Sequence, residues 1–94
     1  MTLVGREKLH CFILNHANAR NWIENWITDV QNATWKDSRN IKDRYSNSSF
    51  LANNIVIFNV KGNRYRLEVQ IAYKTQKVIV KWIGTHAEYS KRYK

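Results

Sequence analysis

The sequence contains no proline, three glycines and a single cysteine in 94 residues. Because no Pro- or Gly-rich stretch marks a linker, we expect a single domain over residues 1–94. One cysteine, Cys11, excludes an internal disulfide and is typical of a reducing compartment. No apolar run approaches the ~20 residues of a membrane span, and residues 11–14 are too few for the core of a signal peptide. We therefore expect a cytoplasmic protein that does not associate with a membrane.

Acidic residues are also scarce, and the imbalance is uneven along the chain. Seven Asp and Glu oppose sixteen Lys and Arg, which gives a net charge of +9. From Lys61 onward nine Lys and Arg oppose two acids, Glu68 and Glu88, so this last third carries +7 of the total. Such a concentration predicts a surface for a polyanion, above all nucleic acid. A basic surface that only keeps the protein soluble would have the same composition.

Motifs of several enzyme classes are absent. No stretch matches a Walker phosphate-binding loop, a dinucleotide-binding fingerprint or a Ser/His/Asp arrangement. The only neighbouring metal-ligand side chains are those of His10, Cys11 and His16, and the first two would point to different faces of a helix. We therefore expect no metal site and no cofactor.

The first third of the chain has helical periodicity. From Glu7 to His16 apolar residues recur at i, i+3, i+4 and i+7, as on one face of a helix. A second helix is predicted from Ala19, with Asn18 as its N-cap and an apolar stripe that contains Trp22 and Trp26. At this spacing we expect the two indoles in the core and not as platforms for bases.

A short third helix is predicted from Arg39 to Tyr45. Asp37 or Ser38 can cap it, and Ile41 forms an i, i+4 contact with Tyr45. Residues 46–49 are interpreted as a loop.

Three β-rich runs follow, over Ile55–Val60, Arg64–Tyr73 and Lys77–Gly84, with turns at Lys61–Asn63 and Lys74–Gln76. The second run alternates strictly between apolar and mostly polar residues, which is typical of a half-buried antiparallel strand. In the third run the alternation predicts one face made of Val78, Val80 and Trp82, and another made of Lys77, Ile79, Lys81 and Ile83. Thr2–Val4 is a short additional candidate strand.

These elements predict an α+β fold in which the N-terminal helices pack on one face of a small, mostly antiparallel sheet. The other face would stay partly open, with Arg64, Arg66 and Lys81 projecting from it. The residues after Gly84 are expected to form a basic tail that bears His86, Tyr89 and Tyr93.

Eight residues are candidates for cleaving RNA without a metal ion: Lys61, Arg64, Arg66, Lys81, His86, Tyr89, Arg92 and Tyr93. Such cleavage needs one group to take the proton of the 2′-hydroxyl, another to protonate the leaving 5′-oxygen, and cations that stabilise the phosphate charge. His, Lys and Tyr can move protons, Arg binds phosphate through paired hydrogen bonds, and a Tyr can stack on a base. The residue types fit equally well a set of solvated cations with two packed tyrosines.

Several segments over nearly the whole chain resemble the HigB family of toxins, in the RelE/ParE-like superfamily. They are Ala33–Lys36, Ile41–Tyr45, Phe58–Leu67 and Ile83–Tyr89, in which the strings FN-x-KGN-x-YRL and GTHAEY are specific. The resemblance implies a RelE-like fold with Thr2–Val4 in the sheet and an RNA site on its concave face. It also implies an mRNA endonuclease, in many members acting on ribosome-bound message, and a HigA-type antitoxin with a helix-turn-helix domain. Members often carry Pro where Ser38 and Ser46 stand here.

The same resemblance implies roles for particular residues. In RelE-like relatives an Arg in the YRL strand, a basic residue after the last strand and a C-terminal Tyr act in cleavage; these match Arg66, His86 and either Tyr89 or Tyr93. Lys61 would join Arg66 at the scissile phosphate. Contacts along the RNA are expected from Asn63, Arg64, Lys74, Lys81, Arg92 and Tyr93.

Two other functions are compatible with the sequence. One is a non-catalytic inhibitor of the ParE kind, which would bind a protein such as gyrase through the same fold. The other is a plain RNA-binding module.

Overall fold

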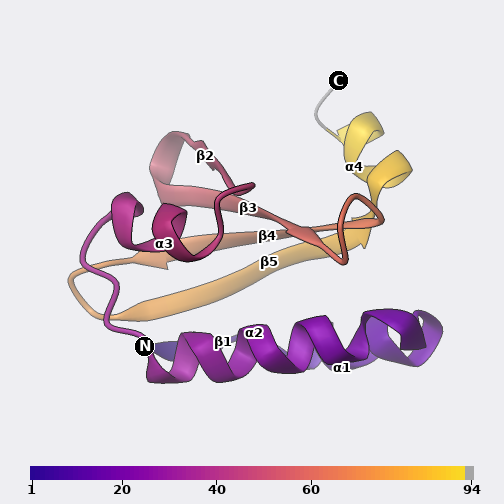
Figure 1. Cartoon of the computed structure of the whole chain (residues 1–94), viewed down its shortest axis with the longest axis horizontal. Helices are drawn as coiled ribbons and strands as arrows, with labels where there is room; N and C mark the ends of the chain where they lie inside the picture. The colour runs from indigo at the N-terminus through magenta and orange to yellow at the C-terminus, as the bar shows by residue number, and fades with distance from the viewer. Residues whose placement is uncertain (93–94) are drawn as a thin grey trace.

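The computed structural model of the chain describes residues 1–92. It contains a five-stranded sheet in the order β1-β5-β4-β3-β2, with α1 and α2 along one face (Figure 1). The elements are β1 (Thr2–Val4), α1 (Arg6–Asn15), α2 (Arg20–Asn32), α3 (Ser38–Arg44), β2 (Ser49–Leu51), β3 (Ile55–Val60), β4 (Tyr65–Ala72), β5 (Lys77–Thr85) and α4 (His86–Arg92). Short 3-10 turns cover Ala17–Ala19 and Ala52–Asn54.

The predicted α+β architecture is confirmed. The strands β3, β4 and β5 form an antiparallel meander, and β1 joins its edge parallel to β5. The strand β2, which pairs antiparallel with β3, was not predicted, and its first residue, Ser49, was interpreted as the end of a loop. Its three residues are all exposed, so they carry no alternation that would mark a half-buried strand.

The predicted helices form, but the N-cap predicted for α2 is wrong. The side chain of Asp37 accepts a hydrogen bond from the backbone N–H of Arg39, as an N-cap does at the start of α3. Asn18 does not cap α2, because a 3-10 turn precedes that helix and Ala19 stands at its N-cap. The side-chain oxygen of Asn18 instead accepts a hydrogen bond from the hydroxyl of Tyr65, at 2.6 Å.

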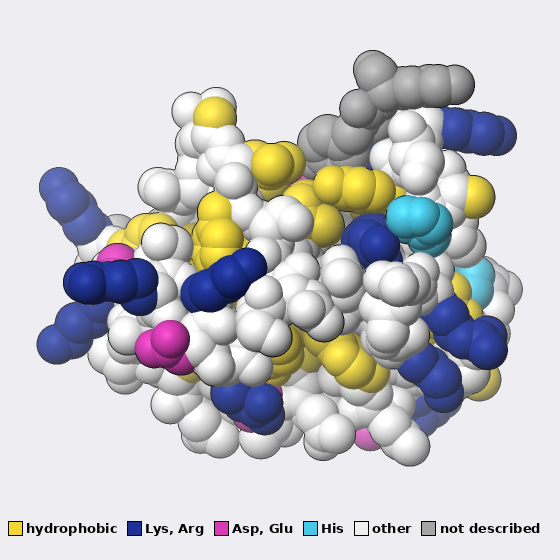
Figure 2. Space-filling model, turned by 45° about the horizontal axis from the view of Figure 1, so that its top comes forward, with side chains coloured by type: hydrophobic (Ala, Val, Ile, Leu, Met, Phe, Trp, Pro, Cys, Tyr) yellow, Lys and Arg dark blue, Asp and Glu magenta, His cyan; other side chains and the backbone are white. Residues whose placement is uncertain are grey.

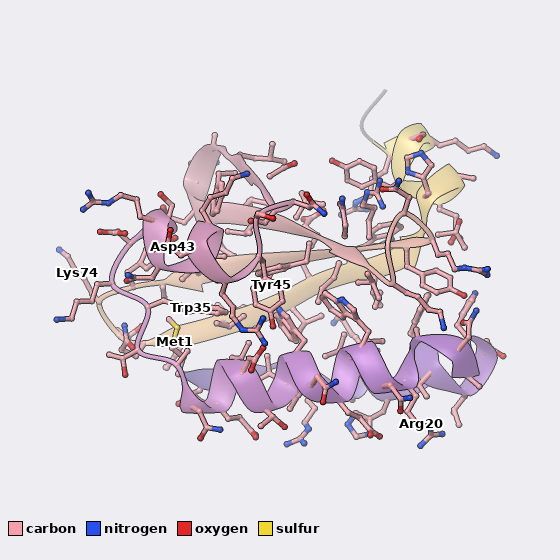
Figure 3. All side chains as sticks on the ribbon, viewed as in Figure 1. Met1, Arg20, Trp35, Asp43, Tyr45 and Lys74 are labelled. Carbon is pink, nitrogen blue, oxygen red and sulfur yellow. The ribbon has the colours of Figure 1, made fainter. Side chains whose placement is uncertain are left out.

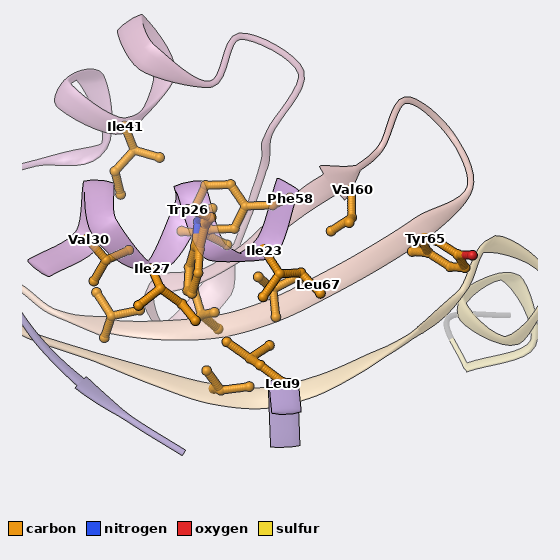
Figure 4. Packing of buried hydrophobic residues seen from close by; sticks show 14 of the residues in the cluster. Leu9, Ile23, Trp26, Ile27, Val30, Ile41, Phe58, Val60, Tyr65 and Leu67 are labelled. Carbon is orange, nitrogen blue, oxygen red and sulfur yellow. The ribbon is translucent and has the colours of Figure 1, made fainter. Parts of the chain in front are cut away.

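The core lies between the two long helices and the sheet (Figure 4). Trp26 of α2 packs edge-on against Phe58 of β3, with ring centroids 5.5 Å apart. The inward residues of β4, from Tyr65 to Ile71, are buried as the alternation predicts. Trp26 is buried and Trp22 packs against the same cluster, which confirms that these indoles belong to the core.

A β-bulge in β5 overturns the predicted facing of its second half. Glu68 of β4 pairs with Trp82, but the next residue, Val69, pairs with Val80, so Lys81 is an extra residue on β5. An extra residue reverses the alternation beyond it. Val78 and Val80 face the helices as predicted, whereas Trp82 faces the opposite side of the sheet, together with Glu68. We call this second side the open face.

The indole of Trp82 lies over Gly84, two residues along on the same face. A Cβ added at Gly84 would lie 2.4 Å from Cζ2 of Trp82, closer than any real contact. Glycine at this position therefore lets the indole lie against the backbone of β5.

Both outer strands flank only one half of the sheet. β1 pairs with residues 77–79 and β2 with residues 55–57, so within residues 1–92 no strand pairs with the outer edges of β5 and β3 beyond these positions; we call them bare edges. This second half carries the β3–β4 turn and leads into α4 (Figure 1). Among residues 1–92, no helix has both the length and the apolar content needed to cross a bilayer.

We expect Gly84→Ala to destabilise the fold by about 1–3 kcal/mol, the usual effect of overpacking. The cause would be the clash with Trp82, so Gly84→Ala should have little effect in a Trp82→Ala background. Urea unfolding of the four proteins in this double-mutant cycle measures the coupling. An equal effect of Gly84→Ala in both backgrounds would contradict the predicted contact.

Candidate functional site

Three segments meet at the half of the sheet with bare edges. Arg66, the second residue of β4, lies between Asn59 of β3 and Gly84 of β5. The β3–β4 turn, residues 61–64, adjoins them, with positive φ at Lys61 and Gly62. The backbone N–H of His86 donates a 3.0 Å hydrogen bond to the carbonyl of Arg64, which ties the start of α4 to this turn.

The helix α4 occupies the stretch that was predicted to be a tail. Its start is a capping box: the backbone N–H of Thr85 donates to Glu88 Oε1 at 2.8 Å, and the N–H of Glu88 donates to Thr85 Oγ1 at 3.2 Å. Hydrogen bonds to the Glu88 carboxylate, first from the backbone N–H of Thr85 and second from its side chain, lower the pKa of this carboxyl. The Thr-x-x-Glu spacing was therefore a sequence signature of this helix start.

A series of contacts, in which two aromatic rings lie between two arginines, joins α4 to the open face. The Glu68 carboxylate accepts a 3.2 Å hydrogen bond from Arg92 Nε, and the guanidinium of Arg92 lies 5.1 Å from the ring centre of Trp82. Trp82 in turn contacts Tyr89, with ring centroids 6.5 Å apart. The Arg66 guanidinium lies 5.8 Å from the centre of the Tyr89 ring.

Arg66 is held in place yet half-exposed. Its Nη1 donates a 3.1 Å hydrogen bond to the carbonyl of Tyr65, and its guanidinium lies over Tyr89. Because a guanidinium carries five N–H donors, this arrangement leaves donors for an anionic ligand. Such a fixed, partly exposed arginine suits the bidentate recognition of a phosphate.

Positive charge surrounds this cluster. Figure 2 shows Lys and Arg side chains gathered at both ends of the molecule, with the visible histidine side chains at one of them. Lys61, Asn63 and Arg64 are exposed on the β3–β4 turn, and His86 is exposed at the start of α4. His86 and Tyr89 are three residues apart, so they are neighbours on one face of α4.

Residues 1–92 contain no group of three or more His, Cys, Asp and Glu side chains placed to hold a metal ion. His16 stacks on Phe12 with ring centroids 4.1 Å apart, and Cys11 is exposed on α1.

The family model that describes the HigB toxin, the RelE-like toxic component of a toxin-antitoxin system, matches residues 19–92. The chain belongs to this family. The match includes the whole of the β3–β4–β5 meander and α4, which carry the cluster around Arg66. Membership in a toxin–antitoxin family implies an antitoxin partner. No individual curated protein matches the chain at a significant level.

The HigB-family fold brings together most of the predicted site residues but not all of them. Lys61, Asn63, Arg64, Arg66, His86, Tyr89 and Arg92 lie at the α4 end of the sheet. Of the two candidate tyrosines, Tyr89 contacts Arg66, and Tyr93 lies outside the described residues.

Two lysines lie elsewhere. Lys74 belongs to the β4–β5 turn, at the end of the sheet away from α4 (Figure 3). Lys81, at the bulge, was predicted to project from the open face. It instead lines a groove with Lys8, Cys11 and Phe12 of α1, because the bulge interrupts the alternation there.

Three residues of the cluster were not predicted to belong to the site. Trp82 was assigned to the core face, and the bulge that moves it has no clear sequence pattern. Glu68 is buried, and its partner Arg92 is 24 residues away in the chain. Asn59 lies at the site because it pairs with Arg66 across β3 and β4, a register that the sequence does not show. A glycine two residues after a tryptophan in the strand was the one local sign of an indole lying on the sheet.

The pH dependence of stability should report the capping box. The pKa of Glu88 is lower in the folded than in the unfolded state. The ionised Glu88 carboxylate therefore stabilises the fold above the ordinary pKa of 4.5, and this stabilisation is lost as the pH falls through the lower, folded pKa. Glu88→Ala should therefore be less stable than the wild type at pH 7, with a difference that narrows towards pH 3. Denaturant unfolding at both pH values measures this. Glu88→Gln, which keeps the accepting oxygen, is the matched control. A stability difference between the wild type and Glu88→Ala that does not change with pH would refute the capping role of the Glu88 carboxylate.

Proposed function

We propose that this HigB-family toxin is an endoribonuclease that cuts mRNA, acting on ribosome-bound message and so stopping translation. The observation that carries the proposal is the fixed arginine–tyrosine pair, Arg66 and Tyr89, with exposed His86 one helical turn from Tyr89 on α4. This pair lies on a chain whose family consists of RelE-like toxins.

The cluster has the groups that cleavage at a 2′-hydroxyl needs. Arg66 would hold the scissile phosphate and stabilise the charge that develops on it, with Lys61 as a second cation. His86 would act as the acid or base, since imidazole exchanges protons near neutral pH. Tyr89, which orients Arg66, would stack on a base or share in proton transfer. The RNA would extend over Asn63, Arg64 and Arg92, with Lys74, Lys81 and Tyr93 as more distant contacts.

The antitoxin is proposed to be of the HigA type, with a helix-turn-helix domain. A chain of net charge +9 favours a partner with an acidic segment, which would be steered to the basic surface. Covering the open face, or holding the toxin away from the ribosome, would both block cleavage.

Arg66→Ala should abolish toxicity, because loss of one preorganised donor to a transition state lowers the rate by about 10²–10³. The melting temperature should change little, since a half-exposed side chain away from the core contributes about 0.5 kcal/mol or less. The measurements are growth arrest and the mapping of mRNA 5′ ends after induction. Arg66→Lys should recover only part of the activity, because Lys lacks the planar fork.

The matched control for this substitution is Arg20→Ala. Arg20 is exposed on α2, on the other side of the sheet, and its contact with Glu24 is long, at 3.8 Å. The substitution Arg20→Ala removes the same charge as Arg66→Ala and should leave toxicity intact. A fully toxic Arg66→Ala would remove Arg66 from the site. Growth arrest by the wild type with intact mRNA and blocked replication would instead indicate a ParE-like inhibitor.

Cleavage of naked RNA by the purified toxin should survive EDTA, because the described residues offer no set of metal ligands. The assay compares product yields with and without the chelator in a ribosome-free reaction, since ribosomes need magnesium. Activity that is lost with EDTA and returns with one transition metal would disprove metal independence.

A further inference from the structure

A second hollow borders the cluster at the bare edge of β3. It has a volume of about 230 Å³, and its lining includes Trp22, Arg44, Tyr45, Asn47, Phe58 and Asn59. The strand β2 pairs only with residues 55–57 of β3, so it does not cover the edge beyond them. Gly62 of the β3–β4 turn also lines the hollow, and a Cβ placed on it would meet nothing within 4 Å. The hollow is thus open beside the turn that carries Lys61 and Arg64.

Two half-buried aromatic rings, those of Trp22 and Tyr45, line this hollow, and the buried ring of Phe58 packs against Tyr45. The ring centroids of Trp22 and Tyr45 are 6.0 Å apart, and those of Tyr45 and Phe58 are 5.2 Å apart. The hydroxyl of Tyr45 donates to the carboxylate of Asp29, which also pairs with Arg44 at 2.9 Å. Arg44 lies 5.2 Å from the Tyr45 ring centre, so a fixed cation stands beside these rings.

An amide also lines the hollow. Asn47 is exposed, and none of the side-chain hydrogen bonds among residues 1–92 involves it, so it has donors and an acceptor available. The loop that carries Asn47 is held in place, because Ser48 Oγ donates to the carbonyl of Tyr45 at 2.6 Å and Lys42 Nζ donates to that of Ser48 at 3.0 Å. Asn59, the strand partner of Arg66, also lines the hollow at the edge of β3, but it lies on the open face, opposite to its neighbour Phe58.

We propose that this hollow is a nucleobase subsite, which takes one base of the single-stranded RNA whose phosphate lies at Arg66. A base has flat faces that stack on aromatic rings or on a guanidinium, and an edge of donors and acceptors that an amide can read. Asn47 is the specificity-determining residue of the subsite. The position of the phosphate rests on the proposed RNA cleavage, whereas base selection by the hollow can be tested by binding alone.

The test is an NMR titration of the full chain with four 2′-O-methyl homotrinucleotides, one for each base. These probes lack the free 2′-hydroxyl, so their binding does not depend on cleavage. The wild type should prefer one base, with shifts at the Asn47 side-chain amide and the Trp22 indole. Asn47→Ala should lose a preference of about 5- to 150-fold, the range for an amide that reads a base edge. Asn25→Ala, a matched change at an exposed position of α2, should keep it.

Equal affinity for the four probes, no binding, or a preference that survives Asn47→Ala would each overturn the subsite. The cleavage proposal is judged separately, by mapping mRNA ends in induced cells. A wild type that binds with a base preference but cuts no mRNA would refute cleavage and support the subsite. Cuts that depend on Arg66, together with equal affinities for the four bases, would refute the subsite alone.

Discussion

The β-bulge at Lys81 is the feature on which the candidate site depends. Without an extra residue, the alternation of β5 would place Trp82 against the helices with Val78 and Val80. With it, the indole lies on the open face over Gly84. Trp82 then provides the apolar surface against which Arg92 and Tyr89 of α4 pack. One register shift thus determines where α4 rests and where Tyr89 meets Arg66.

The two halves of the sheet differ in how they are supported. One half is flanked by β1 and β2, while the half near α4 has bare edges at β3 and β5. Backbone and side chains at a bare edge remain accessible to a ligand, whereas the core beneath keeps the strands in place. The buried carboxylate of Glu68 is consistent with this division, because its pairing with Arg92 offsets the desolvation of the charge and fixes the end of α4.

Family membership and local chemistry support different parts of the functional argument. The family match identifies a RelE-like toxin and implies an antitoxin. The cleavage proposal rests on the side chains themselves: a guanidinium aimed by Tyr65 and Tyr89, an imidazole one helical turn from Tyr89, and cations on the adjoining turn. Because the same fold carries more than one activity, these residues and not the fold are what the experiments must address.

The sequence by itself determined the helices α1, α2 and α3, the three long strands, the core stripe with Trp26, and the positions of Arg66 and His86 near one end of the meander. Periodicity suffices for these because it follows from the local geometry of helix and strand. Tertiary structure alone decided the facing of Trp82, the exclusion of Lys81 and Lys74 from the cluster, and the pairing of Glu68 with Arg92. Each of these depends on strand register and on contacts between residues far apart in the chain, which local periodicity does not encode.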